Sequence, residues 1–148
     1  MAAYAISNAA ARQWISNDMT YYVQGSAAPQ AGEWVCFKGA TSGRRCGKVL
    51  HTEQEVYGKG HQFCIGENGA LGYGAEGDSG SAMWVEDGDA NVTKKVSIRG
   101  VATQIAGDFR YGHLGEPITC GTTVNWMMNA WGGSVMTEGV VTGCAGGA

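Results

Sequence analysis

The chain has 148 residues with a formal net charge of −3, and 44% of its residues are hydrophobic while only 16% are charged. This composition fits one globular domain with its own core and excludes a disordered chain. Because basic residues form no run, and no stretch approaches the roughly 18 consecutive apolar residues of a membrane helix, we expect neither a nucleic-acid partner nor a membrane anchor.

Short strands dominate the predicted elements. Glycine accounts for 25 residues and proline for 2, which favours many tight turns. Runs rich in β-branched and aromatic residues, bounded by Gly, Asn, Asp and Ser, predict antiparallel strands. In chain order they lie at 20–23, 33–37, 47–51, 62–65, 81–85, 96–104 and 118–122. A series of this kind predicts a closed or nearly closed barrel.

One helix is predicted after the strands. Apolar residues recur at helical spacing over 124–131, and Thr123 precedes them as a candidate N-cap. The recurring residues are Val124, Met127, Met128 and Trp131. An alanine-rich run at 2–15 is a weaker helix candidate, because Ser and Asn interrupt it. We expect the Gly-rich tail at 132–148 to be partly extended, with a frayed end.

The cysteines favour disulfides over a metal site. There are 5 of them, at positions 36, 46, 64, 120 and 144, with no CxxC pair and no His at zinc-ligand spacing. We therefore expect no bound metal. The odd count leaves one thiol over, or implies a partner cysteine outside this sequence, and the pairing of Cys64, Cys120 and Cys144 stays open.

The candidate site is Gly-Asp-Ser-Gly at residues 77–80. A serine hydroxyl is a poor nucleophile, so a hydrolase places it on a tight turn beside a base and beside N–H groups that hold an oxyanion. The glycines at 77 and 80 allow a sharp turn, and the apolar run at 82–85 returns directly into a strand. Taken alone, the motif is better explained as a surface turn.

Three further segments accompany this motif. Residues 35–49, VCFKGATSGRRCGKV, fit a VCxxGxTxGxxCGxV pattern, which by itself also fits a generic disulfide hairpin. Residues 99–104 read RGVATQ, and residues 115–119 read GEPIT ahead of the predicted helix. In this order the four segments resemble the streptogrisin type of bacterial and fungal chymotrypsin-like serine proteases. The resemblance covers about residues 20–131 of the chain.

The resemblance implies an all-β fold, an antiparallel Greek-key β-barrel of the trypsin-like serine protease type with a short C-terminal helix. Residues 31–131 would form the second barrel and the terminal helix. Residues 1–30 would be a remnant of the first barrel with the inter-barrel connection, and residues 132–148 the Gly-rich tail. The resemblance also implies a disulfide between Cys36 and Cys46, a polypeptide substrate and no cofactor.

By the same resemblance, the chain is a serine endopeptidase with Ser79 as the nucleophile. The N–H groups of Gly77 and Ser79 would form the oxyanion hole, and Asp78 would order the loop. Tyr73 and Thr103 would belong to the specificity pocket. Ile105 stands where the family often has Gly, which leaves the substrate preference open.

A base for Ser79 is missing from the pattern. A triad of this fold needs His and then Asp ahead of Ser, but His51 and His61 lie in strand-end and turn contexts, and His113 follows the nucleophile. Asp18 is better explained as a turn residue. We therefore expect a missing N-terminal barrel, or a second copy of the chain, as a partner.

Two interpretations remain from this evidence. In the first, the chain is the C-terminal half of a protease. In the second, it is a catalytically inactive barrel that binds peptides or other partners. A lipase-like α/β-hydrolase is disfavoured, because a strand and not a helix is predicted after the serine. Disulfides predict a secreted or extracellular protein, although residues 1–15 lack the pattern of a signal peptide.

Overall fold

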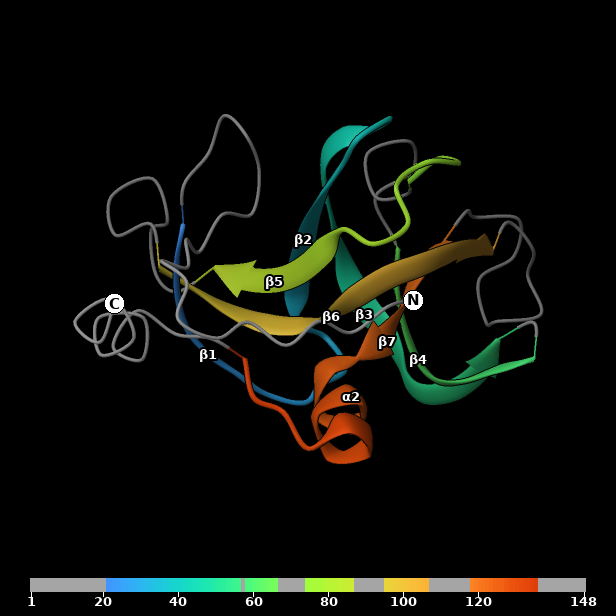
Figure 1. Cartoon of the computed structure of the whole chain (residues 1–148). Coiled ribbons are helices and arrows are strands. Elements are labelled where there is room, and N and C mark those ends of the chain that lie inside the picture. Colours follow the sequence, from blue (N-terminus) through green and yellow to red (C-terminus); the bar gives the residue numbers. More distant parts are fainter. Residues whose placement is uncertain (1–20, 57, 67–73, 87–94, 107–117, 136–148) are drawn as a thin grey trace.

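The computed structural model describes residues 21–56, 58–66, 74–86, 95–106 and 118–135. Within this part the chain forms seven strands and one helix (Figure 1). In chain order they are β1 (Tyr22–Ser26), β2 (Trp34–Gly39), β3 (Gly43–Val56), β4 (Lys59–Gly66), β5 (Ala82–Glu86), β6 (Lys95–Ala106), β7 (Ile118–Thr123) and α2 (Val124–Trp131).

The strands close into a Greek-key barrel. The sheet order is β1-β6-β5-β2-β3-β4-β7, and a further pairing of β6 with β7 closes it. Strands β2, β3 and β4 follow one another, and β5 returns to lie beside β2, which is the Greek-key arrangement. All pairs are antiparallel except β1 with β6, where residues 22–26 run parallel to residues 95–98. The predicted all-β barrel with a short C-terminal helix is therefore confirmed.

Each predicted strand is found within a few residues of its expected position, and β3 differs most. It continues to Val56 because Gln54 still pairs with Gln62 and Val56 with Lys59 of β4, through several register shifts. Polar residues of this kind carry a weak strand signal. The helix prediction at 2–15 lies outside the described residues, as does the tail beyond residue 135.

The helix α2 begins where it was predicted, but its cap differs. Thr123 is the N-cap residue by position, yet its side chain makes no capping bond. Its hydroxyl donates instead to Glu53 Oε1 of β3, across 3.2 Å. A carboxylate from a neighbouring strand therefore lies at the helix N-terminus, where negative charge is favourable.

The barrel interior is one apolar core with a smaller satellite. Phe37, Phe63, Met83 and Trp84 are fully buried at its centre. The helix packs against β6 and β7 and adds buried Val124 and Met127 to this core. The satellite cluster contains Val56, Ile118 and the disulfide partners Cys64 and Cys120.

Two disulfides tie the barrel walls together. Cys36 and Cys46, the pair expected from the resemblance, are bonded across β2 and β3. Cys64 and Cys120 are bonded across β4 and β7, again as directly opposed residues. The sequence left this second pair open, and Cys144 lies outside the described residues.

Nothing in the described ranges tests the predicted domain boundaries at residues 30 and 131, which stay predictions.

Within these ranges no helix has the length and apolar character needed to cross a bilayer. They also hold no group of three or more His, Cys, Asp or Glu side chains able to bind a metal ion.

Candidate functional site

A carboxylate organises the turn that carries Ser79. Asp78 is only 4% exposed, although it lies in the loop ahead of β5. Its Oδ1 accepts hydrogen bonds from the N–H groups of Thr41 at 2.8 Å and Ser42 at 3.1 Å. Its Oδ2 accepts one from the N–H of Ala75 at 2.7 Å. The carboxylate thus joins the β2–β3 turn to the turn of Ser79.

These bonds keep Asp78 ionised. Burial by itself would raise the pKa of Asp78, but hydrogen bonds from Ser42 and from the N–H groups of Ala75 and Thr41 outweigh it and lower the pKa. The carboxylate fits because Gly39 lies beside it, where a Cβ would overlap the Asp78 side chain. A Cβ on Gly74 would come within 2.9 Å of Oδ2.

Ser79 lies at the exposed tip of this turn. The glycines on either side have positive φ angles, +99° for Gly77 and +94° for Gly80, as sharp reversal requires. The N–H of Gly80 donates to the carbonyl of Ala102 at 2.8 Å, which fastens the turn to β6. The Ser79 hydroxyl donates to the carbonyl of Thr103 at 3.2 Å.

Two N–H groups beside the hydroxyl are available to a ligand. The N–H of Asp78 donates to Ala75, that of Ser81 to Asp78, and that of Gly80 to Ala102. By contrast, the N–H groups of Gly77 and Ser79 have no acceptor among the residues described. They are the two that the resemblance assigns to an oxyanion hole.

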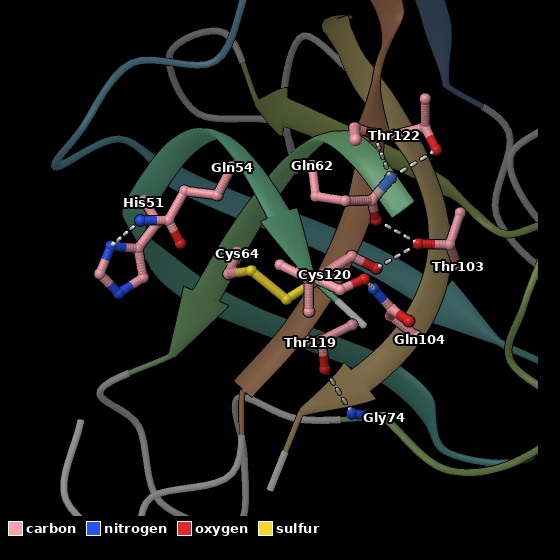
Figure 2. Close-up of a disulfide and its surroundings, with 12 residues drawn as sticks. His51, Gln54, Gln62, Cys64, Gly74, Thr103, Gln104, Thr119, Cys120 and Thr122 are labelled. Carbon is pink, nitrogen blue, oxygen red and sulfur yellow. Dashed lines mark hydrogen bonds between the residues drawn. A yellow bond between two sulfur atoms is a disulfide. The ribbon is translucent and has the colours of Figure 1, made fainter. Parts of the chain in front are cut away.

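Behind Thr103 lies a buried polar network (Figure 2). The Thr103 hydroxyl donates to Gln62 Oε1 at 2.6 Å and contacts the carbonyl of Cys120 at 3.2 Å. Gln62 is 1% exposed, and its Nε2 donates to Thr122 Oγ1 at 2.9 Å and to the carbonyl of Gly60 at 3.1 Å. The network fixes the part of β6 that faces Ser79.

A cavity of about 250 Å³ opens beside Ser79. One wall is residues 74–79, and the other consists of Ala102, Gln104 and Thr119 from β6 and β7. Thr119 Oγ1 accepts the N–H of Gly74 at 2.7 Å, and Gln104 Nε2 donates to the carbonyl of Val56 at 2.8 Å (Figure 2). These bonds hold the two walls in place.

The specificity-pocket residues expected from the sequence are only partly visible. Thr103 lies between two residues that line the cavity but is not itself part of the lining. Tyr73 lies outside the described residues, as does the side chain of Ile105. Their pocket roles stay predictions.

Sequence reasoning missed the polar residues Gln62, Gln104, Thr119 and Glu76. One signal was present, because Gln62 opens the otherwise apolar run Phe63, Cys64 and Ile65. A polar residue in that position is typical of a buried hydrogen-bonded group.

Neither histidine in the described ranges is hydrogen-bonded to Ser79. His51 Nδ1 lies 3.3 Å from Gln54 Nε2. His61 Nδ1 lies 2.9 Å from Glu53 Oε2, and its ring stacks on Trp126 with a centroid separation of 4.7 Å. His113 lies outside those ranges.

No protein-family model and no curated protein matches the chain. Solved structures do match it. A glutamic acid specific serine protease, described as using a novel histidine triad in substrate binding, matches with a TM-score of 0.60 at 19% identity over 82% of this chain. The fold is that of the trypsin-like serine proteases.

Further solved structures share this trypsin-like fold. Protease A of Thermobifida fusca matches with a TM-score of 0.56 at 24% identity over 82% of this chain. Chymotrypsin of Cellulomonas bogoriensis matches with a TM-score of 0.58 at 22% identity, again over 82% of this chain. The chain spans only 58%, 58% and 59% of the length of these three proteins.

Proposed function

We propose that the chain carries the nucleophile-bearing half of a serine endopeptidase. Ser79 attacks the peptide carbonyl, and the N–H groups of Gly77 and Ser79 stabilise the oxyanion that forms. Asp78 holds the turn through its bonds to the N–H groups of Thr41, Ser42 and Ala75. The observation that carries the proposal is the exposed Ser79 hydroxyl beside two N–H groups that have no acceptor in the described part of the chain.

The proposed chemistry is acyl transfer. The Ser79 oxygen bonds to the substrate carbonyl carbon, its proton passes to a base, and the base returns a proton to the leaving amine. Water then hydrolyses the acyl-enzyme and regenerates Ser79. Donors already fixed before the reaction stabilise the oxyanion without reorganisation, which is why such a turn is effective.

The base comes from outside the residues that surround Ser79 here. We propose that an N-terminal barrel, or a second copy of this chain, provides the His and Asp. This agrees with the coverage of just over half of each related protease. Until that partner docks, the Ser79 hydroxyl keeps its proton and donates a hydrogen bond to the Thr103 carbonyl.

One alternative has an observation in its favour. Because the Ser79 hydroxyl is bound to a backbone carbonyl and to neither described histidine, the chain also suits a non-catalytic barrel that keeps a peptide-binding cleft. The two functions differ in whether Ser79 reacts as a nucleophile.

We propose no acid specificity for this chain. The glutamic acid specific serine protease uses a histidine triad in substrate binding. None of the described residues that line the cavity beside Ser79 is a histidine. We also propose that the protein works outside the cell, because two buried disulfides need an oxidising compartment to form.

A serine-directed fluorophosphonate probe tests the proposal. The folded chain is incubated with the probe, alone and with candidate N-terminal barrels of trypsin-like proteases, and the adduct is located by peptide mass spectrometry. Ser79→Ala is the blank. Labelling of Ser79 in either mixture supports the endopeptidase, whereas a folded chain that is labelled in neither supports the binding module.

A further inference from the structure

The peptide unit between Glu76 and Gly77 lies at the centre of a tight turn. The N–H of Asp78 donates to the carbonyl of Ala75 at 3.1 Å, which closes a β-turn over residues 75–78. Gly77 has a φ of +99°, which fits the third residue of a type II turn. Rotation of the central peptide unit would give a type I turn, with the same closing bond and a negative φ at Gly77. Because glycine accepts both signs of φ, Gly77 by itself selects neither form.

A side chain from another hairpin contacts this peptide unit. The Thr41 hydroxyl donates to the carbonyl of Glu76 at 2.8 Å. In a planar trans peptide unit the C=O and N–H bonds point in opposite directions, so the N–H of Gly77 points away from Thr41. In the type I form the carbonyl would turn away from Thr41 and lose this bond. The Thr41 hydroxyl therefore favours the type II form.

Thr41 is itself held in place by its backbone. It lies in the turn at residues 40–42 between β2 and β3, in the hairpin that the disulfide of Cys36 and Cys46 closes. Its N–H donates to Asp78 Oδ1 at 2.8 Å. A change of the Thr41 side chain leaves this backbone donor present, so the role of the hydroxyl can be tested separately.

The second N–H group of the proposed oxyanion hole is oriented in the same way. The carbonyl of Asp78 accepts the Ser81 hydroxyl at 2.7 Å and the Ser81 N–H at 3.2 Å. Because the Asp78 carbonyl and the Ser79 N–H belong to one peptide unit, these bonds direct that N–H away from Ser81. Each of the two N–H groups thus belongs to a peptide unit whose carbonyl accepts a hydroxyl. Ser81 is close to Ser79 in the sequence, whereas Thr41 comes from a different hairpin.

We infer that Thr41 is a positioning residue for the oxyanion hole. Its hydroxyl holds the peptide unit of Glu76 and Gly77 in the orientation that presents the Gly77 N–H to the substrate. The inference rests on the proposed function, because it assigns a role to Thr41 in the same site. One ordinary hydrogen bond shifts a two-state equilibrium about fivefold, which is decisive where the glycine itself prefers neither form.

The direction of the Gly77 N–H bond tests this without any reaction. Residual dipolar couplings of the backbone amides are measured by NMR on the weakly aligned full chain. In Thr41→Val, which keeps the side-chain shape but has no hydroxyl, the Gly77 coupling should move towards the value calculated for a type I turn. Thr41→Ser, which keeps the hydroxyl, should retain the original coupling. An unchanged Gly77 coupling in Thr41→Val, or the same change in both variants, overturns the inference.

Two controls separate this effect from a general loss of structure. The Asp78 N–H is bonded to Ala75 in both turn forms, so its coupling should be retained in Thr41→Val. Thr52→Val removes a hydroxyl from an exposed position on β3 and should leave the Gly77 coupling unchanged. If the couplings of Asp78 and Gly77 change together, Thr41 supports the whole turn and not one peptide unit, and the assignment fails.

The rate of fluorophosphonate labelling links the turn to the reaction. In the mixture with an N-terminal barrel, Ser79 of Thr41→Val should be labelled about two- to fivefold more slowly, because only the type II form stabilises the phosphonyl oxygen with both N–H groups. Thr41→Ser should restore the rate. Equal rates in Thr41→Val and the unaltered chain overturn the positioning role.

The outcome is separable from that of the proposed function, since the dipolar couplings do not depend on a nucleophile. If Ser79 is labelled in no mixture but the Gly77 coupling moves in Thr41→Val alone, the endopeptidase fails and Thr41 still fixes the turn. If Ser79 is labelled and Thr41→Val changes neither the coupling nor the rate, the endopeptidase stands and this inference fails.

Discussion

The hydroxyl of Ser79 donates to the backbone carbonyl of Thr103 at 3.2 Å, so the candidate nucleophile is tied to strand β6. Thr103 is in turn held from behind by Gln62, through a hydrogen bond of 2.6 Å between its hydroxyl and the side-chain amide oxygen. The position of Ser79 relative to the barrel therefore depends on a buried amide that never contacts it.

Gln62→Leu should lower the free energy of unfolding by about 1–3 kcal/mol, because buried groups of Thr122 and Gly60 lose their partner. The Gln62→Glu variant should lose more of its free energy of unfolding at pH 7 than at pH 5. A buried carboxylate without a cation has a raised pKa, and protonation at the lower pH removes its charge. Urea unfolding followed by tryptophan fluorescence measures both. Gln24→Leu, an exposed position on β1, is the control, and equal losses in all three variants would contradict the role of the network.

Gly39→Ala should destabilise the protein by at least about 2 kcal/mol, because the added methyl group would overlap the Asp78 carboxylate. The same overlap should weaken the hydrogen bonds that Asp78 accepts from the N–H groups of Thr41 and Ser42. Hydrogen exchange of these two amides, followed by NMR, reports the local effect. Gly25→Ala is the matched control, since a Cβ there meets nothing within 4 Å. Slow exchange retained in Gly39→Ala would count against the proposed packing.

The free energy of unfolding should fall at acid pH, because two carboxylates become protonated there. Burial tends to raise the pKa of Glu33, but its hydrogen bonds from Arg99 and Gln30 outweigh this, and the pKa values of Glu33 and Asp78 are both lowered. A carboxyl with a lowered folded pKa contributes stability that is complete above its unfolded pKa of about 4. That stability is lost as the pH falls through the folded value. We expect the urea midpoint to decline steadily between pH 5 and pH 2.

Glu33→Gln should flatten this decline. It should also lower stability at pH 7, because Arg99, whose side chain is only 10% exposed, loses a bond of 3.0 Å to a charged partner. Glu55→Gln, at an exposed carboxyl, should give a pH curve parallel to that of the unaltered chain. Parallel curves for both variants would show that the ion pair has no part in the acid response.

The two disulfides should contribute unequally to the free energy of unfolding. In the chain-entropy model, the 56-residue separation of Cys64 and Cys120 is worth about 4 kcal/mol, and the 10-residue separation of Cys36 and Cys46 about 3 kcal/mol. Replacing each pair by alanine and measuring guanidinium unfolding gives the comparison. A larger loss from the Cys36 and Cys46 pair would mean that native packing outweighs loop length.

Much of the fold could be predicted because its strands repeat a simple pattern. The alternation and turn residues around 33–37 and 81–85 placed β2 and β5 to within about two residues. The polar end of β3 could not be predicted, since it is held by the pairing of Gln54 and Val56 with β4 and not by the strand propensity of residues 52–55. Thr123 was placed correctly at the helix start, but its hydroxyl bond to Glu53 depends on a strand 70 residues away.

Only the part of the site whose residues are close together in the sequence could be predicted. Gly77, Asp78, Ser79 and Gly80 form one short turn, and their motif could be read directly. The partners of Asp78 come from Thr41 and Ser42, on a different hairpin, and no spacing in the sequence indicates that contact. The same is true of the cavity, because the pairing of β6 with β7 brings Gln104 and Thr119 together in the wall that faces residues 74–79.

The disulfide between Cys64 and Cys120 also encloses the candidate nucleophile within a covalent ring. Every residue from 64 to 120, Ser79 included, lies on that ring. A single cut in the chain anywhere inside it opens the ring without separating the two fragments. A preparation clipped there would migrate as an intact chain on a non-reducing gel and fall into two bands once thiol is added. For a protein proposed to cleave peptide bonds, self-cleavage in this region would thus stay hidden until the disulfide is reduced.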